Sequence, residues 1–293
     1  MKKIAFVTYQ KLPNLTADDR LVLDHLIRHD LTPQAVIWDT HDVAWKSFDA
    51  IILRSCWDYY LRHEEFLSWI ESLEKIGAPP WNLPRVVKWN MDKTYLRTLS
   101  SKGVSIAPSI WLEKGAPANL KKILEAQGWK KAVVKPTISA TAYQTWTTTP
   151  ENAESNQAKL NEILNRSGAL IQKFVDEIQV KGEWSFIFFG GKYSHAVLKR
   201  PKNGDFRVQE EHGGSSEAKN PDQALVKQAQ KILESVAEPL LYARVDAIEM
   251  NGKLTLMELE LIEPVLFLSH HPLAPQRFAE AIIACVEEKS LIH

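Results

Sequence analysis

Residues 244–261 read RVDAIEMNGKLTLMELEL and carry the clearest strand pattern of the chain. Apolar and polar residues alternate on both sides of Asn251-Gly252, a dipeptide that is typical of tight hairpin turns. The pattern predicts two antiparallel strands, Ala243–Ile248 and Lys253–Leu261.

Three carboxylates in this hairpin are candidate metal ligands. Side chains alternate between the faces of a strand, so Glu258 and Glu260 share one face, while Met257 and Leu259 are expected to be buried on the other. If Asp246 joins the two glutamates, their mutual repulsion requires a cation, and hard oxygen ligands suit Mg²⁺. The alternative is a solvated strand face with a chance acidic pair.

The register of the hairpin tests the metal site. A two-residue turn at Asn251-Gly252 places Asp246 opposite Met257, on the wrong face to join Glu258. A three-residue loop, Met250-Asn251-Gly252, gives the required parity. We therefore expect a loop of odd length.

The first third of the chain alternates short apolar runs with helical patterns. Ile4–Thr8, Ala35–Trp38 and Ala50–Leu53 have strand character, and a helix is expected to follow an N-cap at Thr16. Such alternation predicts a parallel sheet covered by helices. The proline-rich stretch 78–84 marks the end of this α/β domain, which we place at residues 1–85.

The remaining residues predict an α+β body. Residues 86–114 are expected to connect the domains, residues 115–170 to form a lid, and residues 171–293 to form a C-terminal subdomain. A helix is expected over 92–102, and three strands separated by turns are expected between Glu183 and Val208. The other expected helices are 63–76, 119–127, 151–165, 221–236 and 275–287, and the other strands are 109–112, 131–135 and 169–175.

Two lysines and a hydroxyl-rich loop are candidate phosphate ligands. Lys93 lies at a helix start, and Lys135 ends an apolar strand, where it can bind a polyphosphate as a point charge. The segment from Pro136 to Ala142 is rich in small and hydroxyl residues, so its backbone N–H groups can approach phosphates. Taken singly, both lysines can equally be surface residues beside an ordinary loop.

Bulk composition narrows the classes of protein. The 293 residues are 45% hydrophobic and 25% charged, with 36 basic and 36 acidic residues, which argues against a dedicated nucleic-acid binder. The short apolar run at the N-terminus lacks a small-residue cleavage site, so we expect neither a signal peptide nor a membrane span. Cys56 and Cys285 do not have the spacing of metal ligands, and a reducing cytoplasm is expected.

The order and spacing of these motifs resemble the ATP-grasp superfamily, and its glutathione synthetase/RimK-like branch in particular. The resemblance covers roughly residues 90–265. Met91-Asp92-Lys93 and Val133-Val134-Lys135-Pro136 resemble the two nucleotide-binding lysine motifs. Gln172-Lys173-Phe174-Val175 resembles the hinge strand that contacts adenine, and Glu183 resembles the acidic position near the ribose. Asp246, Glu258 and Glu260 resemble the metal ligands.

The resemblance implies mixed and antiparallel sheets that clasp ATP, with Mg²⁺, or Mn²⁺ as the alternative ion, on the three carboxylates. The reaction it implies is phosphorylation of a carboxylate by ATP, followed by attack of an amine on the acyl phosphate. The residues expected to bind nucleotide are Lys93, Lys135, Ser139, Gln172, Lys173, Phe174, Val175 and Glu183. Arg200, Arg207 and Arg244 are the expected catalytic residues. Small-molecule carboxylate and amine substrates are the expected partners, without nucleic acid or membrane, and a homodimer is an option.

Two positions depart from the family pattern. Glu260 stands where the family usually has Asn, and the lid loop Ser139-Ala140-Thr141-Ala142 lacks the usual glycines. Three functions remain open: a carboxylate–amine ligase, an intramolecular cyclase, and a nucleotide-binding module without turnover. Candidate specificity residues are Arg54, Trp57, Asp58, His270 and His271.

Overall fold

The structure, a computed structural model, describes residues 1–292. Its front domain is a three-stranded sheet in which β1 (Lys2–Thr8) lies between β2 (Leu31–Ile37) and β3 (Ala50–Ser55). Both pairings are parallel, so the expected parallel sheet is confirmed. Thr16 caps the first helix, its hydroxyl oxygen accepting a hydrogen bond from the backbone N–H of Asp19 at 2.9 Å. The helices of this domain are α1 (Ala17–Arg20), α2 (Leu23–Ile27) and α3 (His63–Lys75).

Two short helices connect the front domain to the rest of the chain. They are α4 (Pro84–Met91) and α5 (Tyr95–Ser101). The expected single helix over 92–102 is therefore corrected to α5, and α4 was not predicted. Pro84 occupies the first turn of α4, where a missing N–H costs nothing, so the last proline of the stretch 78–84 begins a helix.

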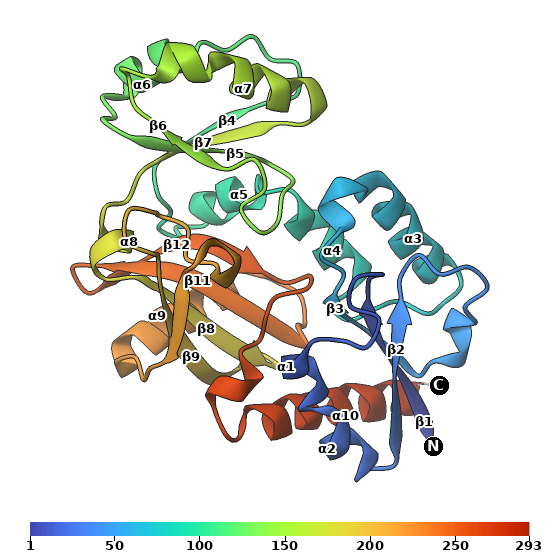
Figure 1. Cartoon of the computed structure of the whole chain (residues 1–293). Helices are drawn as coiled ribbons and strands as arrows, with labels where there is room; N and C mark the ends of the chain where they lie inside the picture. The colour runs from blue at the N-terminus through green and yellow to red at the C-terminus, as the bar shows by residue number, and fades with distance from the viewer. Residues whose placement is uncertain (293) are drawn as a thin grey trace.

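A lid covers the body of the molecule (Figure 1). Its four-stranded antiparallel sheet has the order β4-β7-β5-β6, and α6 and α7 pack on the side away from the body. The lid has its own apolar core, which includes Leu124, Val134 and Leu160. The sheet takes in strands on both sides of residues 115–170. The bounds are β4 (Ser109–Leu112), α6 (Leu120–Gln127), β5 (Ala132–Pro136), β6 (Trp146–Thr148), α7 (Ala153–Arg166) and β7 (Ala169–Lys173).

The body is a five-stranded antiparallel sheet with the order β10-β9-β8-β11-β12. The third strand expected before Val208 is wrong. Residues 201–214 form an irregular loop instead, in which the Asp205 carboxylate accepts hydrogen bonds from the backbone N–H groups of Phe206 and Arg207 and holds a turn. The bounds are α8 (Glu177–Val180), β8 (Glu183–Phe189), β9 (Lys192–Arg200), β10 (Ser215–Ala218), α9 (Gln223–Glu234), β11 (Tyr242–Met250), β12 (Lys253–Glu260) and α10 (Ala274–Ile292).

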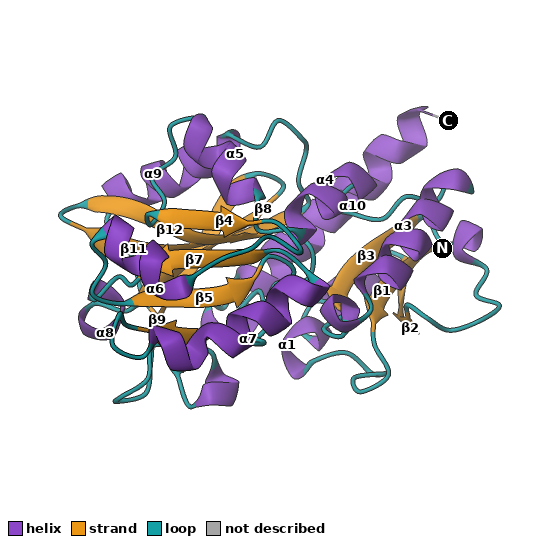
Figure 2. Cartoon of the chain, turned by 90° about the horizontal axis from the view of Figure 1, so that it is seen from above, coloured by secondary structure: helices purple, strands orange, loops and turns teal. Residues whose placement is uncertain are grey.

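The front domain and the body share one apolar core. Ile4 and Ile52 of the front sheet belong to the same buried cluster as Phe278 of α10 and Tyr242 of β11. The Tyr242 hydroxyl also lies 2.7 Å from the carbonyl oxygens of both Leu53 and Ile262. Figure 2 shows the front sheet to one side of the other two sheets, with α10 running beside both parts. The front domain is thus fixed to the body. No helix within residues 1–292 has the length and apolarity of a bilayer span.

Arg54 contributes a buried ion pair to this junction. Its side chain is 1% exposed, and its Nε lies 2.8 Å from Asp19 Oδ1. An Nη2 hydrogen bond reaches the carbonyl of Pro264 at 2.8 Å. Arg54 does not line the cavity described below, so the structure places it in the scaffold and not among specificity residues.

Replacing Arg54 by methionine is expected to lower the free energy of unfolding by about 3–5 kcal/mol, because Asp19 would remain buried without its cation. Urea denaturation of the full chain measures this. The matched control is Arg62→Met, which breaks half-exposed ion pairs to Asp39 and Asp58 and is expected to cost about 1 kcal/mol or less. Equal losses in both variants would contradict the assignment.

Candidate active site

A cavity of about 380 Å³ lies between lid, body and front domain. The lid contributes Lys135 and Gln172, the body contributes Glu258, and the front domain contributes Trp57 and Tyr59. Eight apolar residues of its lining belong to one cluster, which we call the apolar end. The apolar end is formed by Val133, Phe174, Val175, Ile178, Phe206, Val208, Ile248 and Met257.

The hairpin of β11 and β12 brings two of the predicted metal ligands opposite each other. The turn has two residues, Asn251 (φ +53°) and Gly252 (φ +74°), and pairs Met250 with Lys253, so the prediction of an odd-length loop is wrong. A β-bulge restores the parity, because the register shifts by one residue between Asp246 and Ala247. Asp246 therefore pairs with Glu258.

Met257 is the extra residue of this bulge. Ala247 pairs with Leu256 and Asp246 with Glu258, which leaves Met257 without a partner in the ladder. The expectation that Met257 is buried is wrong: its side chain is partly exposed and lines the apolar end of the cavity. Leu259, by contrast, is buried as expected.

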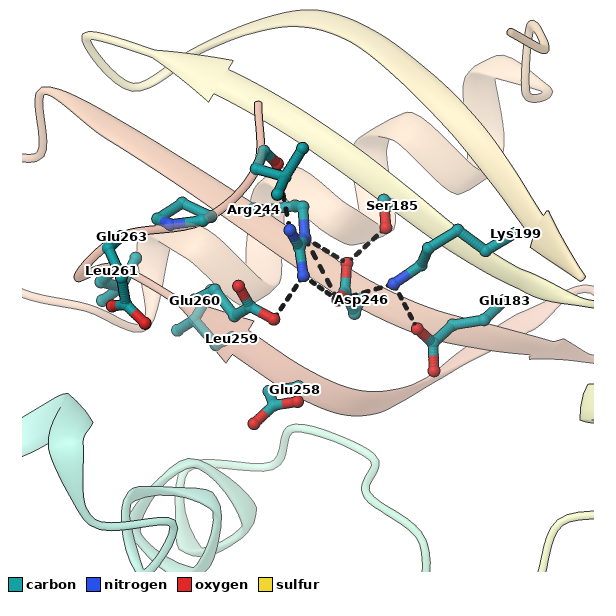
Figure 3. A network of polar contacts seen from close by, with 12 residues as sticks. Glu183, Ser185, Lys199, Arg244, Asp246, Glu258, Leu259, Glu260, Leu261 and Glu263 are labelled. Atoms are coloured by element: carbon teal, nitrogen blue, oxygen red, sulfur yellow. Dashed lines mark hydrogen bonds and ion pairs between the residues drawn. The ribbon is translucent and has the colours of Figure 1, made fainter. Parts of the chain in front are cut away.

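Asp246 is the centre of a buried ion network (Figure 3). Arg244 approaches both of its carboxylate oxygens, with Nε 3.0 Å from Oδ1 and Nη2 2.9 Å from Oδ2. Ser185 donates to Oδ1 at 2.5 Å, and Lys199 Nζ lies 2.9 Å from Oδ2 and 2.6 Å from Glu183. Burial opposes ionisation, but Arg244 and then Lys199 hold the pKa of Asp246 below its usual value. Asp246 is therefore a carboxylate with both oxygens already satisfied.

Glu258 and Glu260 point into the cavity with free coordination capacity. Each side chain is 30% exposed, and each uses one oxygen in an ion pair: Glu258 Oε1 lies 3.0 Å from Lys93 Nζ, and Glu260 Oε1 pairs with Arg244. Burial raises the pKa of Glu260 to about 7 against the opposing effect of Arg244. Glu258 keeps a lowered pKa, since Lys93 and Lys135 outweigh its burial. The pair fits a cation that brings further oxygen ligands.

Two ammonium groups face this pair from the lid side. Lys93 Nζ donates to the carbonyl of Ser139 at 2.6 Å and pairs with Glu258, which leaves one of its three donors for a ligand. Lys135 lines the cavity, and in the described chain its Nζ makes no ion pair within 4 Å. Burial lowers the pKa of Lys135, and Glu258 opposes that shift. Lys135 is thus a desolvated cation, as expected of a phosphate ligand.

Comparison with known proteins identifies this arrangement. The family model of the N-terminal domain of D-cycloserine synthetase DcsG matches residues 4–82. The cycloserine biosynthesis protein DcsG of Streptomyces lavendulae is 30% identical over 267 residues, covering 86% of this chain and 88% of that protein. The chain belongs to the ATP-grasp superfamily.

Solved structures agree with this assignment. The crystal structure of D-cycloserine synthetase DcsG matches with a TM-score of 0.85 and 25% identity, over 97% of this chain and 99% of that one. The D-alanine–D-alanine ligase of Bacillus anthracis has the same fold, with a TM-score of 0.71 and 16% identity over 99% of this chain and 100% of that one. This ATP-grasp chain is an ATP-dependent ligase that forms C–N bonds on amino acids or small peptides. A nucleotide-binding module without turnover is thereby excluded.

The lid loop of this ATP-grasp enzyme adopts glycine-like backbone conformations without glycine. Thr141 (φ +50°), Ala142 (φ +56°) and Gln144 (φ +47°) are all left-handed, at a cost of about 1–3 kcal/mol each. Contacts on both sides hold the loop: the Tyr143 ring packs on Tyr60 at 5.1 Å, and the Thr141 carbonyl lies 3.4 Å from His212 Nε2. The loop lines the cavity without any glycine, and its contact with the nucleotide stays a prediction.

The hinge strand reaches the apolar end, but part of its backbone is already bonded. Lys173 N–H donates to Pro108 at 2.8 Å, and Phe174 N–H donates to Lys131 at 3.0 Å. Contact between these residues and adenine stays a prediction.

Within residues 1–292 no group of three or more His, Cys, Asp or Glu side chains is arranged to hold a metal ion. Metal ligation by Asp246 likewise stays a prediction.

The structure brings together only some of the other predicted residues. Arg207, Trp57 and His270 line the cavity. Arg200 does not line it, because its half-exposed side chain turns toward Glu217 and the carbonyl of Val180. Two candidate specificity residues also lie off the lining: Asp58, which pairs with Arg62, and His271.

Two residues of the cavity region, Ser185 and Glu263, were not predicted from the sequence as site residues. Ser185 lies in an otherwise apolar run, and only its pairing with Asp246 on the neighbouring strand reveals its role. Glu263 follows the end of β12, where strand periodicity no longer predicts direction.

Proposed function

We propose that this enzyme phosphorylates a carboxylate at the centre of the cavity, with Lys93 and Lys135 on the phosphates and Glu258 and Glu260 on Mg²⁺. The observation that carries the proposal is the contact of Lys93 with Glu258 at 3.0 Å, beside the desolvated Lys135. Cationic and acidic groups that face each other across a cavity suit a triphosphate with its divalent ion. Mg²⁺, when bound, neutralises charge that develops between the phosphates.

The chain's own residues supply the remaining steps. Arg244 is locked by Asp246 and Glu260, so it presents a fixed positive field to the reacting carboxylate without rearrangement. Arg207 holds Asp205 through Nε and Nη2, which leaves Nη1 for the substrate carboxylate. The lid excludes water, which otherwise hydrolyses the acyl phosphate before the amine attacks.

We also propose that the enzyme is located in the cytoplasm.

ATP turnover tests this proposal. Purified chain with ATP and Mg²⁺ is expected to release ADP and phosphate only when the correct members of a pool of amino acids and dipeptides are added. Omission of Mg²⁺ is expected to abolish release. ADP formation that is independent of every added carboxylate, or the absence of nucleotide binding, would overturn the proposal.

Intramolecular cyclisation is a second candidate function, favoured by the similarity to DcsG, whose description is D-cycloserine synthetase. In that reaction the attacking amine and the activated carboxylate lie in one substrate. The mass of the product separates the two: a cyclase yields the substrate minus one water, whereas a ligase yields the sum of two substrates minus one water.

A further inference from the structure

The cavity continues past Glu258 and Glu260 to an end formed by the front domain and the segment after β12. Trp57 and Tyr59 line this end from the front domain, and Glu263 and Val265 line it from the body. Because the proposed function assigns the lysines to the phosphates, we take this part of the cavity, which the front domain lines, as the space for the substrate.

Glu263 lacks the close cationic partner that the cavity carboxylates of β11 and β12 have, because Lys93 and Arg244 act on it only from beyond ion-pair distance. Asp246, Glu258 and Glu260 each have a lysine or arginine partner within 4 Å. Within residues 1–292 the carboxylate of Glu263 makes no ion pair within 4 Å. In Figure 3 Glu263 lies on the far side of Glu260 from Asp246, and no contact is drawn to it.

Two aromatic residues of the front domain, Trp57 and Tyr59, lie near Glu263. Trp57 Nε1 donates to the backbone carbonyl of Glu263 at 3.1 Å, which fixes the indole beside it. Tyr59 also lies within its electrostatic reach: burial and then the charge of Glu263 raise the pKa of the Tyr59 hydroxyl. Burial and then Glu260 raise the pKa of Glu263 itself to about 8, as expected of a carboxylate that lacks a cation.

The chemistry of these walls indicates which cation is missing. Mg²⁺ requires several oxygen ligands in octahedral geometry, whereas indole and phenol rings offer π faces that attract organic cations. A single carboxylate flanked by aromatic rings suits an ammonium group, which donates a charged hydrogen bond to the carboxylate and packs against the rings.

We propose that Glu263 binds the ammonium group of the substrate, so that the enzyme selects amino acids with a free, positively charged amine. This inference rests on the proposed function, and it makes Glu263 a specificity residue of the same cavity. Replacing the ammonium by a hydroxyl of similar size removes the positive charge that would hold Glu263 in its ionised form.

Binding of matched probes tests the inference. The full chain with Mg²⁺ and a non-hydrolysable ATP analogue is titrated with D- and L-alanine and D- and L-serine, and then with the α-hydroxy counterparts, D- and L-lactate and D- and L-glycerate. We expect at least one amino acid to bind about 10- to 100-fold more tightly than its hydroxy counterpart, which is the range for one charged hydrogen bond. Glu263→Gln is expected to remove this preference, and Glu263→Asp to restore part of it.

A matched control removes a different acid from the same cavity. Glu211 is exposed at the rim, and Glu211→Gln is expected to keep the preference. Unchanged binding of the ATP analogue to Glu263→Gln shows that this variant is folded. The comparison of amino acids with hydroxy acids in the wild type tests the inference even if the variant does not fold. Equal affinity for ammonium and hydroxyl probes, binding of none of the four amino acids, or a preference that persists in Glu263→Gln would overturn the inference. If the ATP analogue does not bind to the wild type at all, the proposed function is overturned instead.

Discussion

Glu258→Gln is expected to lower the rate of ADP formation by about 10³-fold or more. The carboxylate of Glu258 faces the cavity with one oxygen on Lys93 and the other available to a cation. A neutral amide binds Mg²⁺ poorly, and it also weakens the hold on Lys93. Single-turnover measurements of ADP formation at saturating ATP report the loss directly.

A second readout separates a lost metal site from a damaged fold. In Glu258→Gln, Mg²⁺ is expected to stabilise the nucleotide complex less against heat, while the melting temperature of the unliganded chain stays within a few degrees. Glu249→Gln is the matched control on the same hairpin, since Glu249 pairs with Lys181 outside the cavity lining. Wild-type turnover in Glu258→Gln would remove Glu258 from the metal site.

The sequence predicted those parts of the site that follow from periodicity within one strand. Glu258 and Glu260 share a face because side chains alternate, and Lys135 lines the cavity on the same face of β5 as Val133. The prediction that Asp246 shares a face of the hairpin with Glu258 is correct, but the predicted cause, a loop of odd length, is wrong. The sequence favours a two-residue turn at Asn251-Gly252, and the bulge at Met257 corrects the register, a feature that no local pattern signals.

Features that depend on tertiary contact could not be predicted. Arg200 lies at the end of β9, and its direction is set by the carbonyl groups near Val180, which are remote in sequence. Glu263 belongs to an irregular segment after β12, so only the assembled front domain places Trp57 beside it. Polar and apolar residues alternate over residues 205–208 as in a strand, but the side chain of Asp205 folds this part of the loop into a turn.

Lys135→Met is expected to weaken ATP binding by about 10²-fold, because truncating a buried charged partner costs about 2–5 kcal/mol. Lys135 is desolvated and unpaired in the described chain, so a phosphate is the group that satisfies it. Titration calorimetry with Mg²⁺ and a non-hydrolysable ATP analogue measures the loss. Lys130→Met, an exposed lysine of the same lid, is the control and is expected to bind as the wild type.

The pH dependence of the same binding identifies the group. Burial lowers the pKa of Lys135, so in the unliganded enzyme this lysine loses its proton at a lower pH than an ordinary lysine. Phosphate binding requires the charged form, and affinity is therefore expected to fall as pH rises through that lowered pKa. In Lys135→Met this alkaline fall is expected to disappear, because no ammonium remains to titrate. An identical fall in wild type and variant would assign it to another group, and combined with unchanged affinity it would leave Lys135 without a role in binding phosphate.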